Sequence, residues 1–185
     1  MNLKEIQFKN FCQFHHAQRI QFASDNNDQN ITLISGPHAS GNTSILHAIL
    51  FCLYGEQWVG FPRKLIDLIN PLARKQYQSM GNRLESYVQL EFEHQKKTYT
   101  IQRTILGKVK GPQIIEAESE VTLVITEGDI ITYRHKDPQQ VLELIKSILG
   151  DETLDLFIFS TEMAEALTSM MDGQKQGHPK VCLPF

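Results

Sequence analysis

The chain has 185 residues, of which 41% are hydrophobic and 21% charged, so it is long enough for one domain with a buried core. The formal net charge of −3 gives no nucleic-acid footprint by itself, which leaves any contact with DNA to a local patch or a partner. No apolar run reaches membrane-spanning length and the first ten residues carry charges, so we expect a cytoplasmic protein without a signal peptide or a membrane segment.

The chain is expected to open with two strands. Ile6 and Phe8 alternate with polar neighbours, and Ile20 and Phe22 repeat the pattern. Residues 25–30 are all polar and predict a turn before the next element.

The stretch from residue 31 to residue 55 predicts a strand, a tight loop and a helix. Ile31–Ile34 is a short apolar run, which is typical of a strand covered on both faces. Gly36 and Gly41 favour a turn, and apolar side chains then recur at helical spacing over Thr43–Tyr54. We expect Thr43 to cap this helix and Gly55 to end it.

This order of elements makes a phosphate cradle, because backbone N–H groups and a helix N-terminus converge on the loop. Gly36 and Gly41 have the spacing of the P-loop pattern G-x-x-x-x-G-K-[ST], and Thr43 occupies the position of the magnesium-binding hydroxyl. Asn42 occupies the position of the lysine. The stretch is therefore either a nucleotide site, complete or decayed, or an ordinary strand–turn–helix. The candidate binding residues are Gly36, Pro37, His38, Ala39, Ser40, Gly41, Asn42, Thr43 and Ser44, with Thr43 as the magnesium ligand if nucleotide binds.

Antiparallel hairpins are expected in the middle of the chain. After an irregular span with a short helix over residues 65–69, apolar and polar residues alternate from 88 to 105, with a polar turn at 94–97. A second hairpin is expected over 121–133, turning at Gly128 and Asp129. We expect Lys108, Lys110, Gly111 and Pro112 in the loop between the hairpins, where the lysines either are solvated or contact nucleic acid.

The last elements are predicted to be helical. Asp137, followed by Pro138, has the pattern of a helix start, and Gly150 that of a helix end. A short buried run over residues 156–159 and a helix over 161–171 follow. Residues 172–185 show no periodicity, so the sequence predicts a domain over residues 1–171 and an irregular tail over 172–185.

Four phrases, taken in this order, resemble the N-terminal ATPase lobe of the SMC/SbcC/DndD group, which are ABC-type ATPases with long coiled coils that act on DNA. They are LKEIQFKNFCQF, GPHASGNTSILHAILFCLYG, YVQLEFEHQKKTYTIQRTI and LFIFSTEMAEAL. The DndD-like ATPases of DNA modification and defence look most similar. The resemblance covers about residues 1–171 and implies an α/β P-loop NTPase lobe, with a mixed sheet and antiparallel hairpins.

The departures from that family bear on activity. Cys12 stands where the family has Arg or Lys, His38 and Ala39 replace an Asn-Gly pair, and residues 160–162 include no glutamine-loop Gln. The signature, the Walker B acids and the switch histidine are expected in a C-terminal lobe that this chain does not include. The family hydrolyses ATP, but the resemblance then implies weak or absent binding of ATP and Mg²⁺, no catalytic residue in this chain, and little hydrolysis by it alone.

Three functions remain open on the sequence. The chain is an ATPase lobe that works with a second lobe, a non-catalytic module that binds a partner protein, or a truncated ATPase. We expect association with a second ATPase lobe or self-association, with DNA reached through a partner complex, in DNA repair, modification or defence. The alternative to association is that residues 172–185 fold back over the exposed surface.

Overall fold

The computed structural model describes residues 1–23, 31–37, 40–57, 64–80, 84–110 and 113–150. The chain divides into two compact units, Met1–Leu149 and Gly150–Phe185, and the structure described below is that of the first. Its strands are β1 (Asn2–Phe11), β2 (Phe14–Gln21), β3 (Glu85–His94), β4 (Lys97–Lys110), β5 (Gln113–Glu127) and β6 (Ile130–His135). Its helices are α1 (Asn42–Tyr54), α2 (Pro71–Met80) and α3 (Pro138–Leu149), with short 3-10 helices η2 (Gly55–Gln57) and η3 (Leu65–Leu68).

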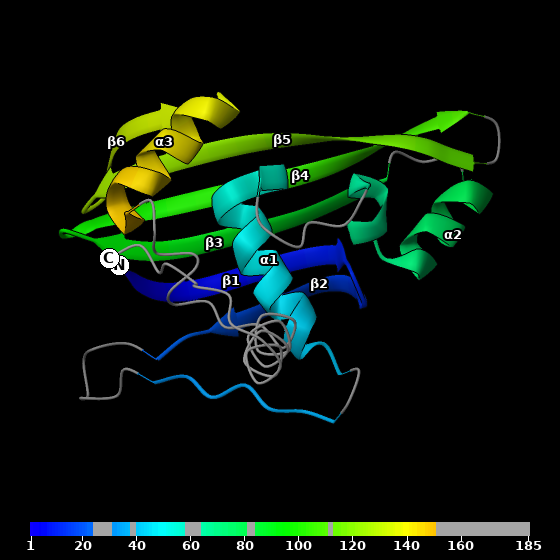
Figure 1. Ribbon diagram of the computed structural model, residues 1–185, viewed down its shortest axis with the longest axis horizontal. Coiled ribbons are helices and arrows are strands. Elements are labelled where there is room, and N and C mark those ends of the chain that lie inside the picture. Colours follow the sequence, from blue (N-terminus) through cyan, green and yellow to red (C-terminus); the bar gives the residue numbers. More distant parts are fainter. Residues whose placement is uncertain (24–30, 38–39, 58–63, 81–83, 111–112, 151–185) are drawn as a thin grey trace, which may run out of the picture. The chain divides into compact units, whose positions relative to one another are not determined.

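The six strands form one sheet in the order β2-β1-β3-β4-β5-β6, and every neighbouring pair is antiparallel (Figure 1). The alternation seen in the sequence sets the register. Ile6 lies opposite Leu90, Leu90 opposite Ile101, and Ile101 opposite Leu123, so the fully buried side chains form a row across one face.

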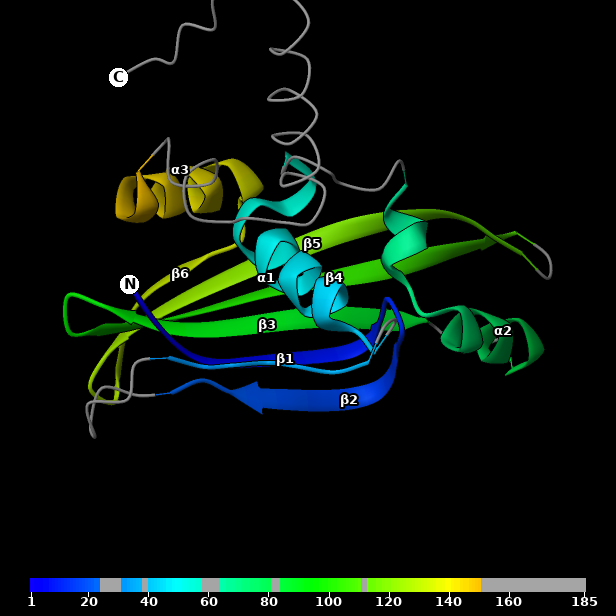
Figure 2. The same ribbon diagram turned by 60° about the horizontal axis from the view of Figure 1, so that its bottom comes forward.

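Helices α1 and α3 lie over this apolar face (Figure 2). The Phe51 ring of α1 stacks on Phe11 of β1 with 6.0 Å between centroids, and α3 buries Val141 and Ile145. The opposite face of the sheet carries polar side chains, such as the half-buried Gln89 and Gln102. The sheet thus has one face for the core and one that tolerates water.

The expectation of a buried strand over Ile31–Ile34 is wrong for this structure. The segment belongs to no strand, and Ile31 and Leu33 are 83% and 86% exposed. A run of apolar residues is buried on both faces only where neighbouring strands and helices exist to cover it. Within the described residues no strand pairs with this segment, so the parallel pairing that would make the sheet mixed is not seen among them.

Most of the other elements predicted from the sequence are present in the structure. The α/β class, the opening strands, both hairpins and α3 are confirmed, and the backbone N–H of Gln140 donates to Asp137 Oδ1 (2.9 Å) as the cap requires. Lys108 and Lys110 lie in β4 instead of a loop, because β4 and β5 continue as one long hairpin. Helix α2 was not predicted.

Several predictions fall outside the described residues: His38 and Ala39, Gly111 and Pro112, the run over 156–159, the helix over 161–171 and the tail over 172–185. The predicted domain boundary at residue 171 lies there as well. Among the helices of the described part of the chain, none is both long and apolar enough to cross a membrane.

Candidate nucleotide-binding site

Gly41 sets the junction between the loop and α1. Its φ of 118° is in the region that favours glycine, and it is the N-cap residue of the helix. A Cβ at this position would lie 2.5 Å from Phe14 Cζ and 2.7 Å from Gln13 Nε2. Backbone conformation and close packing therefore both require glycine here. The predicted cap at Thr43 is wrong, because α1 begins one residue earlier and Thr43 lies exposed within its first turn.

The described part of the loop turns tightly in front of α1. The Ser40 N–H donates to the Pro37 carbonyl (3.0 Å), and the Ser40 hydroxyl donates to Asn42 Oδ1 (3.4 Å). A Cβ on Gly36 would lie 2.3 Å from Ser40 Oγ, so the backbone of residue 36 is in close contact with this side chain. Asn42 thus uses its side-chain oxygen within the loop, where the P-loop pattern has a cation.

The first turn of α1 offers backbone donors. The helix's hydrogen bonds begin with the Ile45 N–H, which donates to the Gly41 carbonyl (2.9 Å), so the N–H groups before it have no acceptor within the helix. No side chain of the described residues caps this end, and the first turn holds no acidic residue. These donors and the helix dipole suit an anion, but Asn42 adds no positive charge.

The turn between β1 and β2 packs against the same helix end. The buried Ser44 hydroxyl donates to Gln13 Oε1 (3.1 Å), which ties α1 to this turn. Burial raises the pKa of the Cys12 thiol to about 11, opposed in part by a hydrogen bond with Ser44. The thiol is therefore protonated at neutral pH, so it supplies neither a thiolate nor the positive charge that Arg or Lys would bring to this position.

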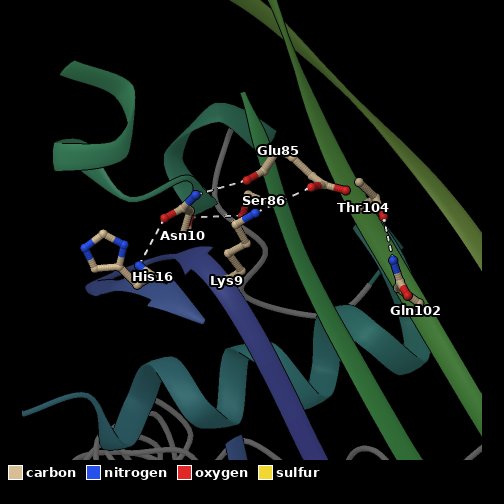
Figure 3. A network of polar contacts seen from close by, with 7 residues as sticks. All are labelled: Lys9, Asn10, His16, Glu85, Ser86, Gln102 and Thr104. Carbon is tan, nitrogen blue, oxygen red and sulfur yellow. Dashed lines mark hydrogen bonds and ion pairs between the residues drawn. The ribbon is translucent and has the colours of Figure 1, made fainter. Parts of the chain in front are cut away.

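A polar network holds the turn in place. Figure 3 shows Asn10 donating from its side chain to the Glu85 carbonyl (3.1 Å) and accepting from the His16 N–H (3.1 Å). The Ser86 hydroxyl donates to the Asn10 carbonyl (3.0 Å), and Lys9 forms an ion pair with Glu85 (3.7 Å). The end of β1 is thereby fastened to the start of β3.

Asn70 fastens the turn from the other side. Its side chain is 2% exposed; it donates to the Cys12 carbonyl (2.9 Å) and accepts from the Leu72 N–H (2.9 Å) and the Ala73 N–H (3.2 Å). Asn70 thus caps α2 and positions the turn at once. The Asn70-Pro71 pair is a sequence signature of a helix start, and this signal would have located α2.

Arg103 secures the far end of α1. This side chain is 4% exposed, and its Nε donates to the Cys52 carbonyl (2.9 Å) near the helix C-terminus. Burial lowers the pKa of Arg103, and Glu56 acts in the opposite direction. Arg103 was not predicted from the sequence. The β4 alternation, which puts residues 99, 101 and 105 in the core, is the signal that could have located it there. Gln13 gave no such local signal, because its contact joins residues 31 positions apart.

The structure thus gathers Gly36, Ser40, Gly41, Asn42, Thr43 and Ser44 at the start of α1, with Pro37 adjoining them. Metal ligation by clustered side chains is not indicated, since the described residues hold no group of three His, Cys, Asp or Glu that could bind an ion. The arrangement can offer backbone donors to an anion and one exposed hydroxyl, on Thr43, to a cation that accompanies it.

The model of one protein family, described as an AAA domain, matches residues 5–175. The chain belongs to this family. It is similar to the DNA double-strand break repair Rad50 ATPase of Thermoplasma acidophilum, with 28% identity over 160 residues that cover 86% of this chain and 15% of the relative. It is also similar to the Rad50 ATPase of Archaeoglobus fulgidus, with 36% identity over 122 residues that cover 65% of this chain and 12% of the relative.

A solved structure from work on the ATP-driven dimerization and DNA-stimulated activation of SMC ATPases aligns with a TM-score of 0.49 and 16% identity, covering 92% of this chain and 99% of that one. The family match and the Rad50 relatives bear out the predicted resemblance to a DNA-associated ATPase lobe of this kind, with Rad50-type ATPases as the relatives found. The chain spans about one-seventh of the length of these Rad50 relatives.

Proposed function

We propose that this chain is the nucleotide-binding N-terminal lobe of a Rad50-like ATPase that acts in DNA repair, over residues 1–171. Its site binds Mg-ATP weakly and does not hydrolyse ATP at a useful rate by itself. The observation that carries the proposal is the start of α1, where backbone N–H groups without intrahelical partners meet Asn42 in place of a lysine. Two Rad50 relatives favour repair over the narrower role in DNA modification or defence that DndD-like ATPases have.

Each part of the site has a distinct task in this proposal. The first N–H groups of α1 hold phosphate oxygens, and the exposed Thr43 hydroxyl contributes to Mg²⁺ binding. Asn42 donates at most a neutral hydrogen bond, from its Nδ2, because its Oδ1 accepts from the Ser40 hydroxyl. His38 and Ala39 belong to the proposed loop by sequence.

The proposal of weak hydrolysis rests on the lack of positively charged side chains at the start of α1. Phosphoryl transfer depends on positioning and on stabilising negative charge in the transition state. The residues at the start of α1 are neutral, and the 185 residues contain no recognisable Walker B or signature segment. The chain therefore needs a second lobe, supplied by another chain or by further sequence, for turnover.

Calorimetric titration with ATP and Mg²⁺ tests the proposal. We expect weak binding by the natural chain and about tenfold tighter binding by Asn42→Lys, because a charge-assisted hydrogen bond contributes about 1–2 kcal/mol more than a neutral one. Asn42→Met is the matched control, since it lengthens the side chain without adding charge and should not tighten binding. Turnover that depends on Thr43 and Mg²⁺ in the pure natural chain would refute the claim of weak hydrolysis.

A second function, that of a partner-binding module, has an observation of its own. Ile31, Leu33 and Ile34 are 83%, 86% and 37% exposed, which is unusual for three apolar residues so close together in a folded protein. Such a segment suits docking of a second ATPase lobe, through which the complex would reach DNA. Absence of ATP binding by both the natural chain and Asn42→Lys, with retained binding of that partner, would favour this function over the first.

A further inference from the structure

Strand β6 is an edge of the sheet that the described residues leave without a second neighbouring strand. It ends the strand order of the described residues, so one row of its backbone groups faces no neighbouring strand among them (Figure 1). Its apolar side chains are exposed too: Ile130 is 70%, Ile131 56% and Tyr133 46% exposed. An edge of this kind is a template for pairing with another chain.

The opposite edge, β2, is protected in the usual ways. Its sequence, FHHAQRIQ, is mainly polar, and Arg19 forms an ion pair with Glu5 on the neighbouring strand (3.5 Å). His16 has a φ of 67°, which interrupts regular extended backbone near the start of the strand. The polar and charged residues of β2 discourage strand addition at that edge, whereas β6 exposes apolar side chains.

The register of the β5–β6 hairpin assigns each β6 side chain to a face of the sheet. An irregularity between Ile125 and Thr126 places Tyr133 opposite the buried Ile125, but Ile131 opposite Thr126. Residues directly opposite each other point to the same face, so Tyr133 shares the apolar face and Ile131 the polar face. By the same rule Arg134, opposite Val124, shares the face of Ile131.

These assignments select one way in which β6 can pair with itself. An antiparallel pair that places Thr132 opposite Tyr133 of a second copy also places Ile131 opposite Arg134 and Ile130 opposite His135. The Ile131–Arg134 match has both side chains on the polar face, and the Ile130–His135 match has both on the apolar face, whereas a shift by one residue would oppose side chains of different faces. The chosen register also brings Asp129 opposite Lys136, and both are exposed.

We propose that β6 pairs antiparallel with β6 of a second copy of this chain, forming a two-fold symmetric dimer with a continuous sheet. The occupant is a second copy because β6 is complementary to itself, with an acidic residue before the strand and a basic one after it. An antiparallel two-fold contact turns this asymmetry into two Asp129–Lys136 pairs. The contact uses no residue of the α1 loop, so it forms without nucleotide and does not depend on the function proposed above.

Sedimentation velocity of the natural chain without nucleotide tests the dimer. We expect a dimer that Ile131→Lys converts to monomer, with an apparent Kd raised at least tenfold, because the lysines would repel Arg134 of the other copy. Gln18→Lys is the matched control, since it adds the same charge at an exposed position of the other edge, β2, and should leave the dimer intact. Unchanged circular dichroism of both variants shows that they are folded.

A charge exchange and a crosslink test the register. Asp129→Lys should weaken the dimer, and the double variant Asp129→Lys/Lys136→Asp should restore it. A zero-length carbodiimide crosslink between Asp129 and Lys136 must join two chains, because seven residues of one strand span about 23 Å. The Glu127–Lys97 ion pair (3.7 Å) within one chain is the positive control for the chemistry.

Other outcomes overturn the proposal. They are a natural chain that stays monomeric, a dimer that forms only with nucleotide, and a dimer that Leu33→Lys abolishes but Ile131→Lys does not.

Discussion

Two glycines with positive φ differ in what surrounds them, and the difference separates backbone conformation from packing. Gly41 has a φ of 118° and is in close contact with Phe14 and Gln13, so an added Cβ has no space. Gly128 has a φ of 60° in the turn between β5 and β6, and no heavy atom lies within 4 Å of the position a Cβ would occupy. At Gly128 only the backbone preference opposes a side chain.

We predict that Gly41→Ala lowers the free energy of unfolding by about 3 kcal/mol and Gly128→Ala by about 1 kcal/mol. The excess at Gly41 comes from displacing Phe14 and the β1–β2 turn. Urea denaturation of the two variants beside the natural chain measures both values. Equal losses would mean that the turn moves away from α1 freely, and that the close contact at the loop is not rigid.

At the scale of single residues, the sequence suggested which residues belong to the candidate site, and that membership stays a prediction; it did not indicate their contacts. The glycine spacing was enough to select residues 36–44. The Ser44–Gln13 and Ser40–Asn42 hydrogen bonds were not predictable, because they depend on how the chain returns and on side-chain rotamers. The prediction that Thr43 caps α1 was wrong, because Gly41 is the N-cap residue.

Among the elements, α2 is joined to the candidate site through one side chain. Asn70 accepts hydrogen bonds from the first N–H groups of α2 and donates to the Cys12 carbonyl, in the turn that packs on α1. The helix start and the turn position are therefore coupled, although they are 58 residues apart in the chain.

Asn70→Ala and Asn70→Ser should separate the two roles of this residue. We predict that Asn70→Ala costs about 2–3 kcal/mol, of which about 1 kcal/mol is the lost cap and the rest is the lost hydrogen bond to the partly buried carbonyl of Cys12. Asn70→Ser keeps a capping oxygen but is too short to reach Cys12, so its cost should be intermediate. Urea denaturation gives the totals, and faster hydrogen exchange of the Leu72 and Ala73 amides in Asn70→Ala alone would identify the cap. Equal costs for the two variants would contradict this division.

Element types were predictable where the pattern is local. Alternation over residues 88–105 and the Asp137–Gly150 pattern both predicted elements that the structure confirms. The pairing of β4 with β5 was not predicted. A loop was expected between two separate hairpins, but these strands pair with each other up to Lys110 and Gln113, past the point where apolar alternation ends.

At the scale of the whole molecule, an apolar run indicates that a segment should be buried, but it does not indicate which other elements bury it. Ile31–Ile34 has the composition of a central strand, yet the described residues leave it exposed, while residues of the same types at Ile101 and Leu123 are fully buried. Strands β3, β4 and β5 supply one another's neighbours through short hairpins. The neighbours of Ile31–Ile34 have to come from elsewhere, and no local pattern specifies them.

The double variant Ile31→Thr/Leu33→Thr tests this difference. We predict that it changes the free energy of unfolding of the isolated chain by less than about 1 kcal/mol, because both side chains are already more than four-fifths exposed. The matched control, Ile101→Thr/Leu123→Thr, makes the same two substitutions at fully buried positions and should cost more than about 4 kcal/mol or prevent folding. Urea denaturation with a constant m-value compares the two. A loss in the first variant similar to that expected of the control would show that Ile31–Ile34 is covered in solution, and the exposed segment could then not serve as a docking site for a second lobe.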